Sequence, residues 1–162
     1  GFYWITAEFL DMSPLLPMVS DYVHSKGYPI TWIPYFQAPG YTEWREKGFD
    51  LAWYQPNYFF YNVPESQIKT ACEQAQANGM GMEMELDERA SVKPLWGDKS
   101  LDYKLRAYMK TFKECGAWAN CQLAYYQDTH AVRHLKDSSD PRDVELYQDL
   151  CDFIAKRPYR NK

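Results

Sequence analysis

Residues 82–87 read Met-Glu-Met-Glu-Leu-Asp, and this strict alternation of apolar and acidic residues is the feature that most constrains the fold. A β-strand points successive side chains to opposite faces, so Glu83, Glu85 and Asp87 share one face of a strand. Strands that are buried on both faces normally read as near-continuous apolar runs. Three acids on the inner face of such a strand carry a desolvation cost, so the pattern indicates a functional site.

The length and hydropathy of the chain are those of one folded domain. With 162 residues and 46% hydrophobic content, we expect a single domain over residues 1–162, as a fragment of a larger barrel. No window approaches the roughly 18–20 apolar residues of a membrane span. The chain opens on Gly-Phe-Tyr-Trp-Ile, which reads as a core strand, so we expect any targeting segment to precede residue 1.

Charge and aromatic content bear on the class of partner. The net charge is −4, and Lys and Arg are scattered without a basic stripe, which argues against a nucleic-acid partner. The chain holds fourteen Tyr and six Trp. Such rings stack on apolar ring surfaces and hydrogen-bond at their edges, which suits sugars. The alternative is that most of these rings fill the core.

No metal or cofactor is expected. The four cysteines show no Cys-x-x-Cys spacing, which disfavours zinc ribbons and thioredoxin-like sites. Cys115 and Cys121 flank an expected turn, and a bridge between them is the alternative to free thiols. His130 and His134 could share a helix face, but no third ligand at matching spacing accompanies them. We find no Ser-His-Asp or Gly-x-Ser-x-Gly arrangement, which disfavours an esterase.

Strand-like runs alternate with helical patterns along the chain. Strands are expected at 2–6, 31–35, 51–55, 80–86 and 123–127. Helices are expected at about 13–26, 40–47, 64–78, 99–115, 129–136 and 141–156. The chain therefore reads as a βα unit repeated five times, which predicts an α/β fold with a parallel sheet.

The size of the unit favours a barrel. Each unit takes about 32 residues, and eight would need about 260, the usual size of a complete eight-stranded barrel. No Gly-x-Gly-x-x-Gly follows a strand, and polar residues gather at the carboxyl ends of strands. We therefore expect five parallel βα units that form the C-terminal portion, strands 4–8, of a TIM-type barrel. An open, doubly wound five-stranded sheet is the alternative.

Several segments resemble a known family. They are residues 1–5 with Glu8, 32–35, 48–50, 53–60, 79–85 and 124–127. Over residues 1–157 the chain is similar to the C-terminal part of a bacterial domain family of unknown function. That family occurs in secreted proteins of polysaccharide-degrading bacteria and resembles glycoside hydrolases with a (βα)8 barrel. The resemblance implies a barrel fold, a carbohydrate partner and a secreted, cell-surface or periplasmic location.

The resembled family implies fold and substrate class only, so two catalytic residues are assigned from their positions on the strands. If the five strands are the last five of eight, the strand at 2–6 is the fourth and the strand at 80–86 the seventh. A large superfamily of retaining glycosidases carries its acid/base Glu after the fourth strand and its nucleophile Glu at the end of the seventh, which here are Glu8 and Glu85. Retention needs two carboxyl groups about 5–5.5 Å apart, one protonated and one ionised. Glu83 is expected to be buried and hydrogen-bonded, and either to pair with a core Tyr or Arg or to orient Glu85.

The expected substrate-binding residues share a position at or beyond the carboxyl end of a strand. They are Gln55, Asn57, Tyr58, Asp87, Trp96, Tyr126 and Gln127. Trp96 lies in an irregular loop after the strand at 80–86, where barrel enzymes hold ligands, and is a candidate for stacking on a sugar. Hydrogen bonding to sugar hydroxyls is the functional interpretation of the polar residues, and loop capping is the alternative.

The expected function is a retaining glycoside hydrolase that acts on a plant or host polysaccharide. The alternatives are a non-catalytic carbohydrate-binding barrel and an open α/β module with another role. Five strands of a barrel leave strand edges and an inner face uncovered. We therefore expect self-association or contact with the missing part of the barrel.

Overall fold

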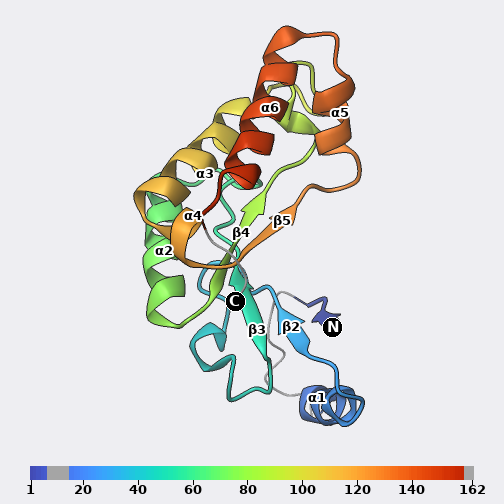
Figure 1. Cartoon of the computed structure of the whole chain (residues 1–162), viewed down its shortest axis with the longest axis vertical. Helices are drawn as coiled ribbons and strands as arrows, with labels where there is room; N and C mark the ends of the chain where they lie inside the picture. Colours follow the sequence, from blue (N-terminus) through green and yellow to red (C-terminus); the bar gives the residue numbers. More distant parts are fainter. Residues whose placement is uncertain (7–14, 159–162) are drawn as a thin grey trace.

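The computed structural model describes residues 1–6 and 15–158. Five parallel strands form one sheet, and the strands lie in the order of the sequence (Figure 1). They are β1 (Phe2–Trp4), β2 (Ile30–Trp32), β3 (Leu51–Tyr54), β4 (Gly81–Glu85) and β5 (Leu123–Tyr126).

Helices follow the strands. They are α1 (Leu15–Ser25), α2 (Ser66–Ala77), α3 (Asp102–Glu114), α4 (Ala117–Asn120), α5 (Ala131–Asp137) and α6 (Pro141–Ala155), with 3-10 turns η1 (Tyr41–Glu43) and η2 (Glu88–Ala90). None of the helices in the described part of the chain is both long and apolar enough to cross a membrane.

The strand order decides between the two folds that the sequence leaves open. A doubly wound sheet reverses its strand order at a switch point, whereas here each strand pairs with the next one in the chain. Right-handed crossovers between successive neighbours place the helices on one face of the sheet. The sheet curls into a half-barrel, so the prediction of five βα units in a barrel-like arrangement is confirmed.

One side of the sheet carries the core. Its side chains are all buried, and α2 packs on β3 and β4 on this side. They are Ile30, Trp32, Ala52, Tyr54, Met80, Met82, Met84 and Leu86. The expected apolar stripe of the helix after β3 is confirmed, because Ile68, Ala71, Cys72 and Ala75 of α2 are buried. The apolar alternation of β4 therefore faces the helices.

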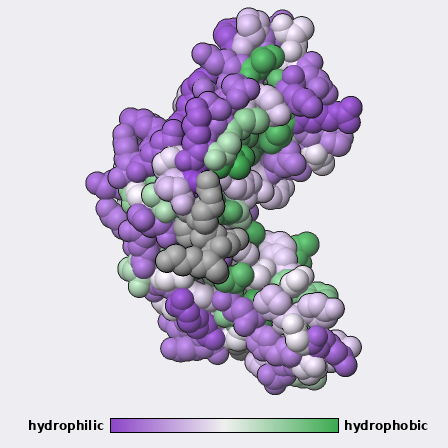
Figure 2. Space-filling view, in the orientation of Figure 1, coloured by the Kyte–Doolittle hydropathy of each residue, from purple (hydrophilic) through white to green (hydrophobic). Residues whose placement is uncertain are grey.

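The other side, here called the inner face, carries no comparable layer among the described residues. Strand register places on it Tyr3, Thr31, Leu51, Trp53, Gln55, Gly81, Glu83, Glu85, Ala124 and Tyr126. Apart from the two glutamates, these residues are half-buried or exposed. Figure 2 shows the surface hollowed on the side away from α2, between the part with α5 and α6 and the part with β2 and α1.

The prediction of a helix at 40–47 is wrong. The structure has only the 3-10 turn η1, followed by further turns. Gly40 and Gly48 take left-handed backbone angles, with φ of 78° and 91°, at the two ends of this segment. A helix of only two turns forms few hydrogen bonds to offset the unfavourable free energy of its nucleation. Glycines at both ends readily adopt left-handed angles, which favours separate turns over a helix.

Candidate functional site

The acidic residues of β4 lie where the alternation predicts, on the inner face. Glu83 pairs in register with Ala124, and Glu85 with Tyr126. The side chains are nevertheless almost inaccessible, since Glu83 is 4% exposed and Glu85 0%. Burial of two carboxyl groups on one strand carries a desolvation cost that specific contacts must offset.

Glu85, the last residue of β4, has partners for both carboxyl oxygens. Gln55 Nε2 donates to Oε1 at 2.7 Å, and the hydroxyl of Tyr108 on α3 donates to Oε2. The Tyr108 oxygen in turn accepts from the backbone N–H of Tyr58 at 3.2 Å. Burial raises the pKa of Glu85, while the bonds from Tyr108 and Gln55 act in the opposite direction. The bonds offset the effect of burial only in part, so the pKa of Glu85 stays raised.

Lys104 fixes the segment after β3 beside this carboxylate. Its buried Nζ donates to the carbonyl oxygens of Tyr58 at 2.7 Å, Phe59 at 3.3 Å and Tyr61 at 2.8 Å. Burial lowers the pKa of Lys104. The three carbonyls replace the water that the ammonium group loses, so Lys104 has a structural role here.

Glu83 differs from Glu85 in its surroundings. Burial, and then the charge of Glu85, raises the pKa of Glu83 to about 8. We find no hydrogen-bond donor to its carboxyl group among the described residues, so the expected burial is confirmed and the expected hydrogen bond is not seen there. After burial, the charge of Glu83 is the next cause that raises the pKa of Tyr3. Glu83 therefore lies on the same side as this half-exposed tyrosine.

Asp87 and Trp96 meet through Arg89. The Arg89 guanidinium forms a two-pronged bond to Asp87, with distances of 2.7 and 3.1 Å, and lies 4.3 Å from the centre of the Trp96 ring. Asp87 also accepts from the Arg89 backbone N–H and so caps η2. Trp96 remains 46% exposed. The expected stacking residue is thus held at the rim with a cation against its ring.

Glu88 ties the loop after β4 to the loop after β5. Its Oε1 accepts from the His130 backbone N–H at 2.7 Å and from the Thr129 hydroxyl at 2.9 Å. Burial acts to raise the pKa of Glu88, but the bonds from His130 and its neighbours outweigh it and the pKa is lowered. An ionised Glu88 is therefore part of the scaffold of the rim.

The remaining expected site residues are placed as follows. Asn57 lines a pocket at the rim, and Tyr58 is buried against Tyr108. Tyr126 is half-exposed, and the centre of its ring lies 5.7 Å from the centre of the Phe60 ring. Gln127 Oε1 accepts from the backbone N–H of Val132 at 3.3 Å, which is a loop-capping contact.

Glu8, the expected acid/base, lies outside the described residues, and its distance from Glu85 stays untested. The two strands that carry the expected pair are nevertheless parallel members of one sheet, since β1 and β4 run in the same direction.

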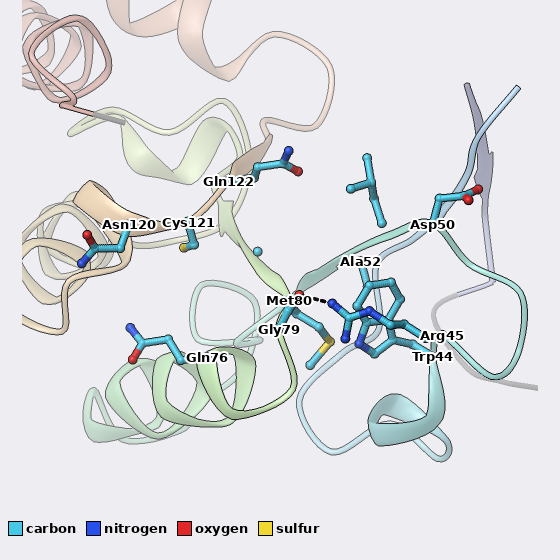
Figure 3. A pocket seen from close by; sticks show the side chains of 12 residues that line it. Trp44, Arg45, Asp50, Ala52, Gln76, Gly79, Met80, Asn120, Cys121 and Gln122 are labelled. Carbon is cyan, nitrogen blue, oxygen red and sulfur yellow. Dashed lines mark hydrogen bonds between the residues drawn. The ribbon is translucent and has the colours of Figure 1, made fainter. Parts of the chain in front are cut away.

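A second hollow lies at the opposite end of the sheet. It has a volume of about 410 Å³ and is lined by residues at the starts of β3, β4 and β5, with Arg45 and Trp44 beside them (Figure 3). Arg45 donates to the carbonyl oxygen of Gly79 at 3.2 Å and so closes the turn between α2 and β4. In barrels this end contributes to stability, whereas the carboxyl end carries the chemistry.

The structure also brings together a serine, a histidine and an aspartate that sequence reasoning missed. His24 Nε2 lies 2.8 Å from Asp50 Oδ2, and Nδ1 lies 3.5 Å from the Ser20 hydroxyl. The buried Ser20 hydroxyl, however, donates to the carbonyl oxygen of Gly48 at 2.9 Å. The Ser20 proton is therefore donated to a backbone carbonyl group and not to His24. The role of the cluster is to hold α1 against the turn before β3. The i,i+4 spacing of Ser20 and His24 was the available signal.

Metal-binding clusters and disulfides are absent from the described part of the chain. No group of three or more His, Cys, Asp or Glu residues is placed there to hold a metal ion. The four cysteines, all within that part, are free. The bridge between Cys115 and Cys121 that the sequence left open is therefore not formed.

Comparison with known proteins identifies a family and no individual relative. Neither the curated proteins nor the solved structures include a match to this chain. A family model described as "Domain of unknown function (DUF4855)" matches residues 1–152. The expectation of a domain family without an assigned function is confirmed. Because the match covers most of its 162 residues, the chain belongs to this family of domains, DUF4855.

Proposed function

We propose that this chain is part of a barrel that hydrolyses glycosidic bonds with retention, and that it contributes the catalytic carboxyl groups. The observation that carries the proposal is the pair Glu83 and Glu85, which lie on the inner face near the carboxyl end of β4. Barrel enzymes build their active sites at this end. Hydrolysis with retention needs one protonated and one ionised carboxyl group.

Burial raises the pKa of both glutamates, but among the described residues only Glu85 has hydrogen-bond donors that act in the opposite direction. Glu85 accepts from Tyr108 and Gln55, which favours its charged form. Glu83 has a pKa of about 8, which favours a neutral acid at pH 7.

In this proposal Glu85 is the nucleophile and Glu8 the acid/base. A protonated Glu83 leaves Glu85 without a second negative charge beside it, so Glu83 is a positioning residue. Glu85 has no exposed surface. Attack on an anomeric carbon therefore requires the Gln55 amide to leave Oε1, and Gln55 lies on the inner face from which a substrate would arrive.

The proposed substrate is a plant or host polysaccharide, and the proposed location is secreted, cell-surface or periplasmic. Support comes from the aromatic residues at the rim. Trp96 and Tyr126 are each 46% exposed and lie in or beside the loops after β4 and β5. Aromatic rings with one open side are suited to stacking on the apolar face of a sugar.

The test is an activity screen of the full-length parent protein on a panel of polysaccharides. Glu85→Gln is expected to abolish hydrolysis. In Glu85→Ala, which vacates the space of the carboxylate, added azide should restore cleavage and give a glycosyl azide of inverted configuration. The matched control is Glu46→Gln, a change at an exposed residue. Full activity of Glu85→Gln would overturn the assignment of the nucleophile.

A second candidate function is non-catalytic carbohydrate binding. It is favoured by one observation, that both oxygens of Glu85 are occupied within the protein. In that case Glu85→Gln should still bind the polysaccharide, and the unaltered protein should bind without cleavage.

We further propose that the rest of a barrel covers the inner face. The edge strand β1 carries exposed apolar residues, with Phe2 and Tyr3 each about half-exposed, and Ile5 beyond it is 84% exposed. Unpaired strand edges of this kind pair readily with other strands. Light scattering of the chain and of the full-length parent would distinguish the outcomes, since self-association of the chain alone should disappear in the parent.

A further inference from the structure

A pocket at the carboxyl ends of β2 and β3 is not used by the carboxyl groups described above. It has a volume of about 500 Å³, and its walls include the aromatic side chains of Tyr35, Phe36 and Tyr61 and the amides of Asn57 and Gln67. We call it the rim pocket. Its volume falls in the range of small-ligand sites, which are mostly apolar with a few placed polar groups.

The wall that contains Tyr35 and Phe36 is anchored to the sheet and the core. Tyr35 continues the sheet beyond β2 through a bridge to Gln55. The centre of the Phe36 ring lies 6.1 Å from the centre of the Tyr54 ring, so the two rings pack together. The Tyr54 hydroxyl accepts from the Gln37 backbone N–H at 2.6 Å and donates to Gln74 Oε1 at 2.9 Å. The turn after β2 is therefore anchored to the core before any ligand arrives.

The opposite wall is fixed around Asn57. Asn57 has a φ of 59°, a left-handed conformation that asparagine tolerates better than most residues. The carbonyl oxygen before it, of Pro56, accepts from Gln67 Nε2 at 2.8 Å. The carbonyl oxygens of Tyr58 and Tyr61 after it accept from Lys104. The strained residue is thus held from both sides, as is common at ligand sites.

The rim pocket adjoins the acidic site through two contacts. Tyr35 in its wall pairs with Gln55, and Gln55 donates to Glu85 at 2.7 Å. Gln55 therefore connects the pocket wall to the carboxylate, although neither Gln55 nor Glu85 is among the described residues that line the pocket.

We propose that the rim pocket binds a neutral pyranose ring of the substrate, at a subsite other than the one that Glu85 contacts. This inference rests on the proposed function. Aromatic walls suit the apolar face of the ring, and phenol and amide groups suit its hydroxyls. None of the described residues that line the pocket carries a charge, so a neutral sugar fits better than a uronic acid.

The test is calorimetric titration of the full-length parent protein, in the Glu85→Gln background to prevent turnover. The probes are cello-, xylo- and mannotetraose, with tetragalacturonate as the charged comparison. Tyr61→Ala is expected to weaken the binding of the preferred neutral probe at least about tenfold. Tyr61 is 58% exposed, so its loss should leave the fold intact.

Two further variants sharpen the result. Asn57→Gly keeps the left-handed backbone and removes the amide, and it should also weaken binding. Tyr103→Ala removes a similarly exposed tyrosine from α3 and should leave affinity unchanged. An unchanged affinity of Tyr61→Ala, or a preference for tetragalacturonate, would overturn the rim-pocket proposal. Binding that is sensitive to Tyr61→Ala in a parent protein without hydrolase activity would instead support the pocket and refute the glycosidase.

Discussion

Gln55 Nε2 and Glu85 Oε1 are 2.7 Å apart, and this bond joins the carboxyl ends of β3 and β4 across the inner face. Glu85 is held on its other side by Tyr108 of α3. One carboxylate therefore connects the sheet, the loop after β3 and the helix after β4. The stability of the rim should depend on the partners of Glu85 as much as on Glu85 itself.

Tyr108→Phe should destabilise the protein by about 1–3 kcal/mol, the cost of unsatisfied buried polar groups. The change removes the hydroxyl that donates to Glu85 Oε2 and accepts from the Tyr58 backbone N–H. Urea unfolding followed by tryptophan fluorescence measures the difference. Tyr103→Phe, at an exposed position of the same helix, is the matched control and should leave stability unchanged. Equal stability of the two variants would show that the Tyr108 bond contributes nothing.

Lys104→Met should release the segment after β3, because three carbonyl oxygens lose their common donor. We expect a loss of roughly 2–4 kcal/mol in the free energy of unfolding. Hydrogen exchange should quicken around residues 58–61. The control, Lys110→Met, removes an exposed lysine from the same helix. An unaltered rate of hydrogen exchange at residues 58–61 would contradict the role of Lys104 in holding this segment.

Asp143→Ala should lower the free energy of unfolding more than a change at an exposed acidic residue on the same helix. The buried Asp143 accepts from the Ser91 hydroxyl at 2.7 Å, the Val92 N–H at 2.8 Å and the Ser138 hydroxyl at 2.8 Å. We expect a loss of roughly 3–5 kcal/mol, since several buried donors lose their acceptor. Asp149→Ala breaks a surface ion pair with Arg106 and should cost at most about 1 kcal/mol. Similar midpoints for the two variants in a thermal melt would refute this ranking.

The predictions that succeeded rest on local patterns. The alternation in residues 82–87 fixed which side chains of β4 share a face, because the two-residue period of a strand is a property of the backbone alone. The βα repeat likewise predicted the parallel half-barrel. The expected helix at 40–47 failed because helical periodicity over eight residues is a weak signal beside two terminal glycines.

Partners that are distant in the sequence could not be predicted. Tyr108 follows Glu85 by more than twenty residues, and only the packing of α3 brings its hydroxyl to the carboxylate. Sequence reasoning assigned Tyr58 to the substrate, but the structure buries it beside Tyr108. The contact of Gln127 with Val132 shows how one residue type can serve capping or binding.

Glu83 gives the protein a pH dependence whose sign follows from its pKa. The pKa is raised from an ordinary value of 4.5 to about 8 in the folded protein, by burial and by the charge of Glu85. Between these values the folded protein holds a proton that the unfolded chain has released. The free energy of unfolding should therefore fall as the pH rises through this range and level off above about 8.

Glu83→Gln isolates this contribution, because glutamine resembles the protonated acid and does not titrate. The stability of the wild-type protein minus that of Glu83→Gln should be most favourable below pH 4.5 and decline by roughly 2–5 kcal/mol toward pH 8. Urea midpoints at pH 5, 6, 7 and 8 measure it. The same difference for Glu46→Gln, at an exposed position, should not change with pH. A flat difference for Glu83→Gln would mean that Glu83 is already ionised at pH 5, and the neutral acid beside Glu85 would then be wrong.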